Sequence, residues 1–488
     1  MAENTITATG TQKYVKKPEF IMYVASVFFY TMMTGMVGNY RNNYLSDVLQ
    51  IHKDYISIYN TVLPIAGFII NFFISMYIDG RKPSKSGKFR PLIIFSTVPA
   101  GILLVLTFVA PSALSGNALL AYLLIVAIGW TVATNFCGCL NMVANFMTSN
   151  LEERDSVISF RSISSAIGNS APLVVVLVLN IIWKNNLALQ YIVGASLCSA
   201  CGIISMLLAM KLVKERVVCV QERKNPLVGI LDVLKNKYAW TIIASDFLKT
   251  FRNIATYMGI YLAVALLGSP SKFLFFGLPT GIGTAVGMLV INFLLKKFNS
   301  RVLYIASGIY SVIINTVAFG VGYLYFKNGS GILQILFVIA LFLIGIQFGA
   351  SNLLPTMFQA DVLESLELQT NGKRLDASLP FVIGIGTTIS SAVAGAIAPQ
   401  ILFDADSLIG YIRPLETAEG LVYLEQSLDT KVLLLFFYTI FHGIMMFLAG
   451  VPFFFYKLTG KTKEDIHNAV LERREQLAKS QGDSDTAE

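Results

Sequence analysis

KLVKERVVCVQERKNPLVGILDVLKNKY, residues Lys211 to Tyr238, is a polar and basic stretch in a chain that is otherwise dominated by apolar segments. Six segments before it and six after it are long and apolar enough to cross a bilayer, which takes about 20 residues of α-helix. These predicted spans cover residues 19–44, 54–78, 91–110, 117–147, 157–183, 188–210, 239–267, 273–295, 302–326, 332–358, 377–403 and 432–456. The pattern predicts an all-α membrane protein with twelve transmembrane helices in two six-helix halves.

The composition agrees with this class of protein. Of the 488 residues, 55% are hydrophobic and 14% are charged, and the mean hydropathy is +0.65, which is too apolar for a protein with a fully water-facing surface. The first 20 residues have no apolar core before their lysines, so we expect no cleaved signal peptide. The five cysteines lie in or beside predicted spans and indicate no disulfide framework.

Basic residues predict how the chain is oriented in the membrane. They cluster at the amino terminus, in the segment 81–90, in the stretch 211–237, in the segment 296–301 and after residue 457. Loops rich in lysine and arginine stay on the cytoplasmic side. We therefore expect a multi-pass protein of the cell membrane, a monomer with both termini in the cytoplasm. The asymmetry also accounts for the net charge of +8, so nucleic-acid binding is not expected.

The basic stretch divides the chain into predicted parts. They are an amino-terminal six-helix half (residues 1–213), a cytoplasmic linker with a short amphipathic helix (214–238), a carboxy-terminal six-helix half (239–457) and a cytoplasmic tail (458–488). The loop after the second span, DGRKPSKSGKFRP, has a weaker counterpart after the eighth, KKFNSRV. Basic loops at matching positions indicate an internal duplication, which is typical of secondary transporters that bind substrate near the bilayer midplane.

Three motifs carry a family resemblance. DGRKPSKSGKFRP (Asp79 to Pro91), TSNLEERDSVISFR (Thr148 to Arg161) and ADVLESLELQTNGKR (Ala360 to Arg374) follow the second, fourth and tenth predicted spans. Together they resemble the glycoside-pentoside-hexuronide:cation symporter family, the melibiose permease-like branch of the major facilitator superfamily. The resemblance implies the major facilitator fold, symport of a sugar or glycoside with a cation or a proton, membrane lipid as the surroundings, and no cofactor.

The chain departs from that family in three places. Gly67 and Asn71 stand on the second span where the resemblance implies acidic residues, and Thr388 stands where it implies a lysine in span eleven. The sequence CGCLNMVANF replaces an Asn-Pro-Tyr-like element in span four. The coupling ion is thereby left open between Na⁺ and H⁺, with Asn71 and Asp246 as the candidate coupling residues. We also expect a substrate that differs from simple galactosides.

The seventh span carries charges. SDFLKTFRN, Ser245 to Asn253, places Asp246, Lys249 and Arg252 three residues apart, so their side chains advance by about 60° per step in a slanting row. A charge at the bilayer midplane costs roughly 2.5–3.5 kcal/mol on insertion scales, so something must offset it. One interpretation is that Asp246 neutralises Lys249 while Arg252 pairs elsewhere or reaches the interface. The other is that one positive charge binds an anionic group of the substrate, because a guanidinium holds a carboxylate or sulfonate bidentately.

Other polar residues are candidates for substrate binding. Because the embedded bases outnumber the single clearly embedded acid, Asp246, the pattern favours an acidic sugar such as a hexuronide. The predicted substrate-binding residues are Thr31, Arg41, Asn42, Asn135, Arg161, Lys249, Arg252, Asn253 and Tyr257.

For some of these residues a structural role is an open alternative. Helix packing would explain Thr31, and a capping or interfacial role would explain Arg41. An interhelical hydrogen bond would explain Asn135, and an interfacial salt bridge would explain Arg161. His442 in span twelve is either a hydrogen-bonded packing residue or part of a proton relay.

Charged residues at the cytoplasmic ends of the spans are predicted to form gating salt bridges that break when the two halves rock. They are Asp79, Arg81, Arg90, Arg154, Asp361 and Glu364. Prolines predict kinks within the spans at Pro64, Pro172, Pro279, Pro355 and Pro380.

The function hypothesis is a secondary active transporter, a cation- or proton-coupled symporter, for a sugar or glycoside. The alternative is a carrier for a neutral glycoside or another small solute, which includes an uncoupled facilitator. An enzyme is not expected, because the sequence has three histidines and contains neither a His-Glu-x-x-His metal motif nor a nucleophile motif. No phosphate-binding loop is present, so ATP is not the expected energy source.

Overall fold

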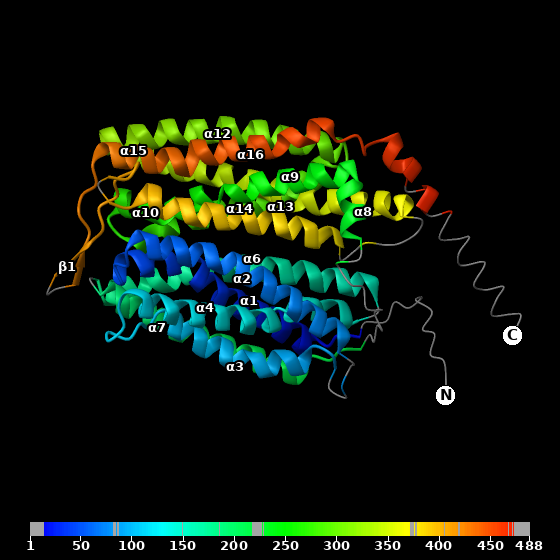
Figure 1. The fold of residues 1–488 in the computed structure, drawn as a ribbon, viewed down its shortest axis with the longest axis horizontal. Helices are drawn as coiled ribbons and strands as arrows, with labels where there is room; N and C mark the ends of the chain where they lie inside the picture. Colours follow the sequence, from blue (N-terminus) through cyan, green and yellow to red (C-terminus); the bar gives the residue numbers. More distant parts are fainter. Residues whose placement is uncertain are drawn as a thin grey trace, which may run out of the picture. The chain divides into compact units, whose positions relative to one another are not determined.

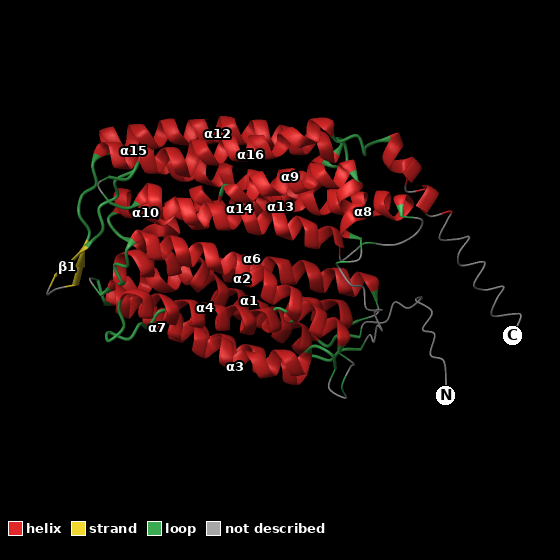
Figure 2. Ribbon diagram, viewed as in Figure 1, coloured by secondary structure: helices red, strands yellow, loops and turns green. Residues whose placement is uncertain are grey.

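The structure is a computed structural model, and it describes residues 14–81, 84, 87–148, 150–184, 186–216, 227, 229–370, 375, 378–404, 406–417, 420–466, 468–470 and 472. The side chains of residues 79, 80, 145, 151, 152 and 155 are outside that description. Helices dominate the described chain, and a single two-stranded hairpin, β1 (Leu415–Thr417) with β2 (Gly420–Val422), is formed within it (Figure 2).

Within the described residues, twelve helical segments are long and apolar enough to span a membrane. They are Lys17–Val48, Lys53–Ile78, Arg90–Thr107, Gly116–Val143, Ser156–Ile182, Leu187–Leu212, Lys237–Leu267, Pro270–Leu294, Ser300–Asn328, Gly331–Gln369, Ser378–Leu402 and Leu428–Phe455. Helices satisfy every backbone hydrogen bond within the segment, which lipid requires. The predicted fold class is confirmed, and the main difference in position is the tenth span, which continues past residue 358 to Gln369.

Contacts divide the chain into two compact units. Unit 1 comprises Met1–Arg223, Ala263–Gly281 and Pro399–Ser427, and unit 2 comprises Lys224–Leu262, Ile282–Ala398 and Leu428–Glu488. The helices of unit 1 are α1 (Lys17–Asn43), η1 (Tyr44–Val48), α2 (Lys53–Gly80), α3 (Arg90–Thr107), α4 (Gly116–Cys137), α5 (Leu140–Val143), η2 (Ala144–Phe146), α6 (Leu151–Ile182), α7 (Leu187–Leu212) and η3 (Pro270–Phe273) (Figure 1).

The remaining helices lie wholly or partly in unit 2. Those that lie wholly within it are α8 (Ile230–Lys235), α9 (Lys237–Phe251), α12 (Ser300–Asn328), α13 (Gly331–Gln369), α15 (Leu428–Phe436), η4 (Phe437–Phe441), α16 (His442–Gly450) and η5 (Val451–Phe455). Three helices have residues in both units: α10 (Asn253–Leu267), α11 (Leu274–Leu294) and α14 (Ser378–Leu402).

In unit 1, α1 packs most extensively against α6 and α7. Small residues permit this approach, because a Cβ on Gly35 or Gly168 would overlap backbone atoms of the facing helix. Near the carboxy-terminal end of α1, Tyr40 packs its ring against Tyr191, and Tyr44 at the start of η1 does the same. Close glycine contacts and aromatic ring packing therefore hold α1 inside unit 1.

In unit 2, α12 packs against α13 and α16. The core at one end is aromatic: Tyr304, Phe358, Phe453 and Tyr456 are all less than 3% exposed, and their ring centroids lie 4.3 to 5.7 Å apart. The described helix of the predicted linker, α8, buries Val233 in the same core.

The spans are interrupted where no proline stands. Helices α2, α6, α11 and α13 continue through Pro64, Pro172, Pro279 and Pro355. Span seven instead breaks at Arg252, between α9 and α10, and span twelve contains the π-helical turn η4 directly before His442. Breaks and π-turns inside membrane helices free backbone groups and occur often at functional sites.

Candidate functional site

The three charges of span seven do not behave alike. Asp246 is 5% exposed, and its Oδ1 lies 2.6 Å from Nζ of Lys249, one helical turn along α9. The hydroxyl of the neighbouring Ser245 lies 3.1 Å from that of Tyr304 on α12, which fixes this part of α9 in the core. Asp246 therefore neutralises the charge of Lys249 locally, as the first of the two interpretations of span seven proposed.

Arg252 is the charge that remains. Its guanidinium lies over the ring of Phe348 on α13, 4.4 Å from the ring centroid, a cation–π arrangement. Its Nη1 is buried and has no hydrogen-bond partner in the part of the chain that the structure describes. Leaving a buried charged donor unsatisfied costs about 1–3 kcal/mol or more. The arrangement is suited to binding an anion, which would satisfy that donor.

The two predicted polar residues after Arg252 lie on α10. Asn253 is exposed, and Tyr257 is half-buried with its ring 5.6 Å from that of Tyr261. Sequence reasoning did not single out Phe348, the ring on which Arg252 rests, because an apolar residue inside an apolar span gives no distinguishing signal.

In span one the predicted residues have mixed surroundings. The Thr31 hydroxyl donates to the carbonyls of Val27 and Phe28 in its own helix, at 2.9 and 3.0 Å, as the packing interpretation expects. The Arg41 guanidinium lies 5.3 Å from the ring centroid of Tyr59 on α2. Asn42, the next residue, is half-buried.

No hydrogen bond or ion pair found among the described residues joins the predicted residues on α2, α4 and α6 to one another. Arg161 donates from Nη1 to the carbonyl of Asn141 at 2.7 Å, so its partner is a backbone carbonyl and not an acid. Asn135 is half-buried on α4, and Asn71 is exposed on α2. Their roles in substrate binding and coupling stay predictions.

Two of the six predicted gating residues have well-defined partners outside the predicted set. Arg90 donates from Nε and Nη2 to the carbonyl of Met210, at 3.0 and 2.6 Å, which joins the start of α3 to the end of α7. Asp361 forms an ion pair with Lys463, 2.7 Å away in the segment after the last span.

The other four gating residues give less information. Arg81, Arg154 and Glu364 are half-buried, and the side chain of Asp79 lies outside the described residues. Whether these residues gate transport stays a prediction.

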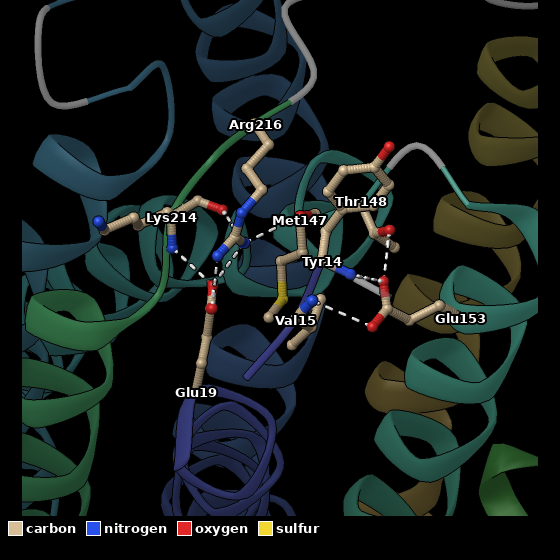
Figure 3. Close-up of polar contacts among 8 residues, drawn as sticks. All are labelled: Tyr14, Val15, Glu19, Met147, Thr148, Glu153, Lys214 and Arg216. Carbon is tan, nitrogen blue, oxygen red and sulfur yellow. Dashed lines mark hydrogen bonds and ion pairs between the residues drawn. The ribbon is translucent and has the colours of Figure 1, made fainter. Parts of the chain in front are cut away.

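A polar cluster at the start of α1 was missed by sequence reasoning. Glu19 accepts hydrogen bonds from Nη1 and Nη2 of Arg216, at 2.8 and 2.7 Å, and from the backbone N–H of Lys214 at 2.9 Å (Figure 3). The hydrogen bond with Glu19 raises the pKa of Arg216 above its usual value. The segment that follows span six is thereby fastened to the start of span one.

Two more glutamates bind backbone N–H groups in the same region. Glu153 accepts from the N–H groups of Tyr14 and Val15, both at 3.0 Å, and from the Thr148 hydroxyl at 2.6 Å (Figure 3). Partial burial acts to raise the pKa of Glu153, but these hydrogen bonds outweigh it, and the pKa lies below the usual value. Glu215 accepts from three consecutive N–H groups at the start of α3, at 2.7 to 3.0 Å, the donors that an anion finds at a helix start.

A second embedded acid, Asp47, was also missed. It is fully buried in η1 and accepts from Asn43 Nδ2 at 2.7 Å, Ser46 Oγ at 2.8 Å and the Tyr423 hydroxyl at 3.1 Å. The available sequence signal was the single acid in YLSDV. That segment follows the polar run YRNN and so resembles the start of a loop. The prediction that Asp246 is the single embedded acid was therefore wrong.

A family comparison decides the class of the protein. Residues 22–460 match the model of a family described as MFS/sugar transport protein, which covers most of the chain. The chain belongs to this family. This is a family of transporters, so the protein is a transporter and not an enzyme. The predicted resemblance and the multi-pass membrane character are thereby confirmed.

Curated relatives of the transporter carry symporter and exporter names. The uncharacterized symporter YjmB of Bacillus subtilis is 25% identical over 473 residues, which cover 95% of this chain and 97% of the relative. The putative glycoside/cation symporter YagG of Escherichia coli is 22% identical over 83% of this chain and 85% of its own length. A putative 2,3-dihydroxypropane-1-sulfonate exporter of Salmonella typhimurium is 24% identical over 79% of this chain and 86% of its own.

Solved structures confirm the fold of the transporter. A point mutant of the nucleoside transporter NupG is 13% identical, with a TM-score of 0.63, and the match covers 90% of this chain and all of NupG. The xylose transporter XylE of Escherichia coli in an inward open conformation is 12% identical, with a TM-score of 0.58, over 93% and 99% of the two chains. At these identities the match shows the major facilitator fold alone.

Proposed function

We propose that this transporter carries a small hydroxylated organic acid, such as a sugar acid, by symport with a cation or a proton. The observation that carries the proposal is the buried Nη1 of Arg252, which has no hydrogen-bond partner among the described residues. The small molecule is the partner, and membrane lipid surrounds the chain. We place the monomer in the cell membrane with both termini in the cytoplasm, on the asymmetry of its basic residues.

The contrast with Lys249 supports an anionic substrate. Lys249 has Asp246 at 2.6 Å, so that pair brings no net charge to the span. Arg252 has the ring of Phe348 instead, which stabilises a cation by about 0.5–2 kcal/mol but accepts no conventional hydrogen bond from Nη1. A carboxylate or sulfonate would satisfy both the charge and the donor, and a guanidinium fork matches the geometry of either group.

The names of the relatives agree with this substrate class. One group of relatives is named for a dihydroxylated sulfonate, and another for a glycoside and a cation. A hydroxylated acid combines the chemical features of both. The symporter names also support a coupled process.

The second candidate is a carrier for a neutral glycoside. The cation–π contact between Arg252 and Phe348 favours it, because a charge that the ring already stabilises has less need of an anionic substrate. Uptake of labelled D-glucuronate into vesicles that contain the protein separates the two. We expect unlabelled D-glucuronate to compete and D-glucose at the same concentration to have little effect, and equal competition by both would contradict the anion proposal.

Coupling is tested in the same vesicles. Accumulation above the outside concentration should collapse either with a proton uncoupler or in sodium-free medium, and the condition that acts identifies the ion. Accumulation unaffected by both treatments would rule out proton and sodium symport. The uncoupled facilitator, by contrast, would show uptake that stops at equal concentrations.

A further inference from the structure

We infer that His442 is a second ligand-contacting residue, which hydrogen-bonds a hydroxyl group of the substrate whose anionic group is bound by Arg252. The inference rests on the proposed function and extends it from the charge of the substrate to its hydroxyl groups. It assigns the recognised ligand to hydroxylated organic anions, as opposed to organic anions in general.

The first observation is an unsatisfied nitrogen. His442 is 3% exposed, and its buried Nε2 has no hydrogen-bond partner among the residues that the structure describes. Buried polar side-chain atoms are nearly always hydrogen-bonded, so each exception needs an explanation. The packing interpretation of His442 expected a satisfied imidazole, and the structure does not show one.

The second observation is the position of His442 in its helix. It is the first residue of α16 and directly follows the π-helical turn η4, just as Arg252 occupies the break between α9 and α10. The residues before them, Phe251 and Phe441, are in contact, with ring centroids 6.3 Å apart. The irregular points of two spans far apart in sequence are therefore neighbours within unit 2.

The third observation is a shared aromatic ring. The Arg252 guanidinium lies 4.4 Å from the centroid of Phe348, and the His442 ring lies 5.0 Å from it at an interplanar angle of 84°. Spans seven, ten and twelve thus each contribute one side chain to this group. Two buried nitrogens that lack partners, carried by different helices, meet around a single phenyl ring.

The packing behind His442 fixes its position. A Cβ on the next residue, Gly443, would lie 3.0 Å from Cβ of Asn315 and 3.1 Å from the carbonyl oxygen of Ser311, so α16 lies tightly against α12. Asn315 directs its own Nδ2 to the Ser311 carbonyl at 2.8 Å and is not bonded to His442. The packing of α16 on α12 therefore holds His442 in place, while its Nε2 has no hydrogen-bond partner among the described residues.

The chemistry of the two groups is complementary. A guanidinium only donates hydrogen bonds and carries a permanent charge, so it suits a carboxylate or sulfonate. An imidazole nitrogen either donates to or accepts from a hydroxyl group. Hydroxylated anions present both kinds of partner, whereas a simple alkyl anion would leave Nε2 of His442 unsatisfied.

The test compares two acids that differ only in hydroxyl groups. Isothermal titration calorimetry of the purified full-length protein measures the Kd of 2,3-dihydroxypropane-1-sulfonate and of propane-1-sulfonate. We expect the wild-type protein to prefer the dihydroxylated acid by about tenfold, the value of one well-made hydrogen bond in a buried site. His442→Phe should abolish that preference by weakening the dihydroxylated acid alone.

Two further variants control the test. His442→Gln keeps a hydrogen-bonding group and should restore part of the preference, which also guards against a phenylalanine that disturbs folding. His52→Phe removes a histidine whose side chain is 59% exposed and should leave both affinities unchanged. If His442→Phe left the preference intact, or weakened both acids equally, the inference would be wrong.

Arg252→Met separates this inference from the proposed function. It should weaken both acids, and if it weakened neither while His442→Phe acted selectively, the anion proposal would fail and the histidine contact would stand. If the wild-type protein bound neither sulfonate, D-glucuronate and cyclohexanecarboxylate form the second matched pair. Binding of neither pair would overturn both proposals together.

Discussion

Two acidic residues of unit 1 and two basic residues of unit 2 differ in how their buried polar atoms are satisfied. In unit 1, Asp47 and Glu19 are at most 4% exposed, and each accepts three hydrogen bonds from protein donors. In unit 2, Arg252 and His442 each retain a buried nitrogen with no partner in the described chain. Asp47 and Glu19 are thus satisfied by the protein, whereas Arg252 and His442 each keep a nitrogen that is not, and among the described residues of unit 1 the Nε atoms of Arg41, Arg154 and Arg413 are likewise buried without a partner.

This difference separates structural charges from candidate ligand-binding charges. A buried charge that is paired and hydrogen-bonded needs no further partner, whereas an unpaired one is retained only where something offsets its cost. Lys249 follows the rule inside unit 2 itself, because it lies beside Arg252 in sequence but has Asp246 as its partner. A count of the charges in a span therefore does not distinguish a paired charge such as Lys249 from one such as Arg252.

The largest expected effect comes from replacing Arg252, with the nearby Lys249 as the comparison. Arg252→Met should weaken transport of the acidic substrate by about 100-fold, because it removes charged hydrogen bonds worth about 3 kcal/mol. Lys249→Met, the matched control, should lower the thermal stability because it leaves the buried Asp246 without its partner, yet keep the preference for acids. Uptake of D-glucuronate relative to D-glucose measures both, and the reverse outcome would break the comparison between paired and unpaired charges.

A smaller effect is expected at the satisfied charges of unit 1. Glu19→Gln should destabilise the protein by about 1–2 kcal/mol, a discounted value because the Arg216 side chain is 26% exposed. Thermal unfolding of the single variants and of the double variant with Arg216→Gln isolates the pair in a double-mutant cycle. Substrate preference should not change, and a change in preference without a loss of stability would show that a satisfied charge also contacts substrate.

The smallest expected effect concerns Glu153. Glu153→Gln should speed amide exchange at Tyr14 and Val15 by about threefold to tenfold, as the loss of the ionised acceptor weakens hydrogen bonds worth about 0.5–1.5 kcal/mol. Because the folded-state pKa of Glu153 is lowered, this contribution is present above the usual glutamate pKa of about 4.3 and is lost as the pH falls through the lowered value. Unchanged exchange rates in the variant would show that the two N–H groups are held by other means.

Particular elements show how far the sequence was a guide to the fold. The number of spans and their approximate positions followed from apolar length alone, because every backbone group in lipid must be satisfied within a helix. Helices α2, α6, α11 and α13 continue through their prolines without a break, whereas span seven breaks at Arg252, where no proline stands. A break that depends on packing against other helices has no local sequence signal.

The candidate site was predicted in part. Arg252 was identified, as was the possibility that Asp246 neutralises Lys249, since both follow from helical spacing. Asp361 was assigned to a gate, but its partner Lys463 lies about 100 residues further along the chain, beyond the reach of spacing arguments. Asp47, Glu19 and Phe348 were missed because their importance lies in contacts with residues far from them in sequence.

Hydropathy and composition specify the membrane class and the twelve spans, and three short motifs indicate the family of this transporter, because these properties depend on local runs of residues. Whether a buried charge has a partner depends on side chains that are brought together from different spans. Tertiary packing alone pairs Glu19 with Arg216. It also brings Arg252 and His442 to the ring of Phe348, each with a buried nitrogen that has no hydrogen-bond partner among the described residues. Such long-range contacts have no periodicity along the chain, so they emerge only when the helices are packed.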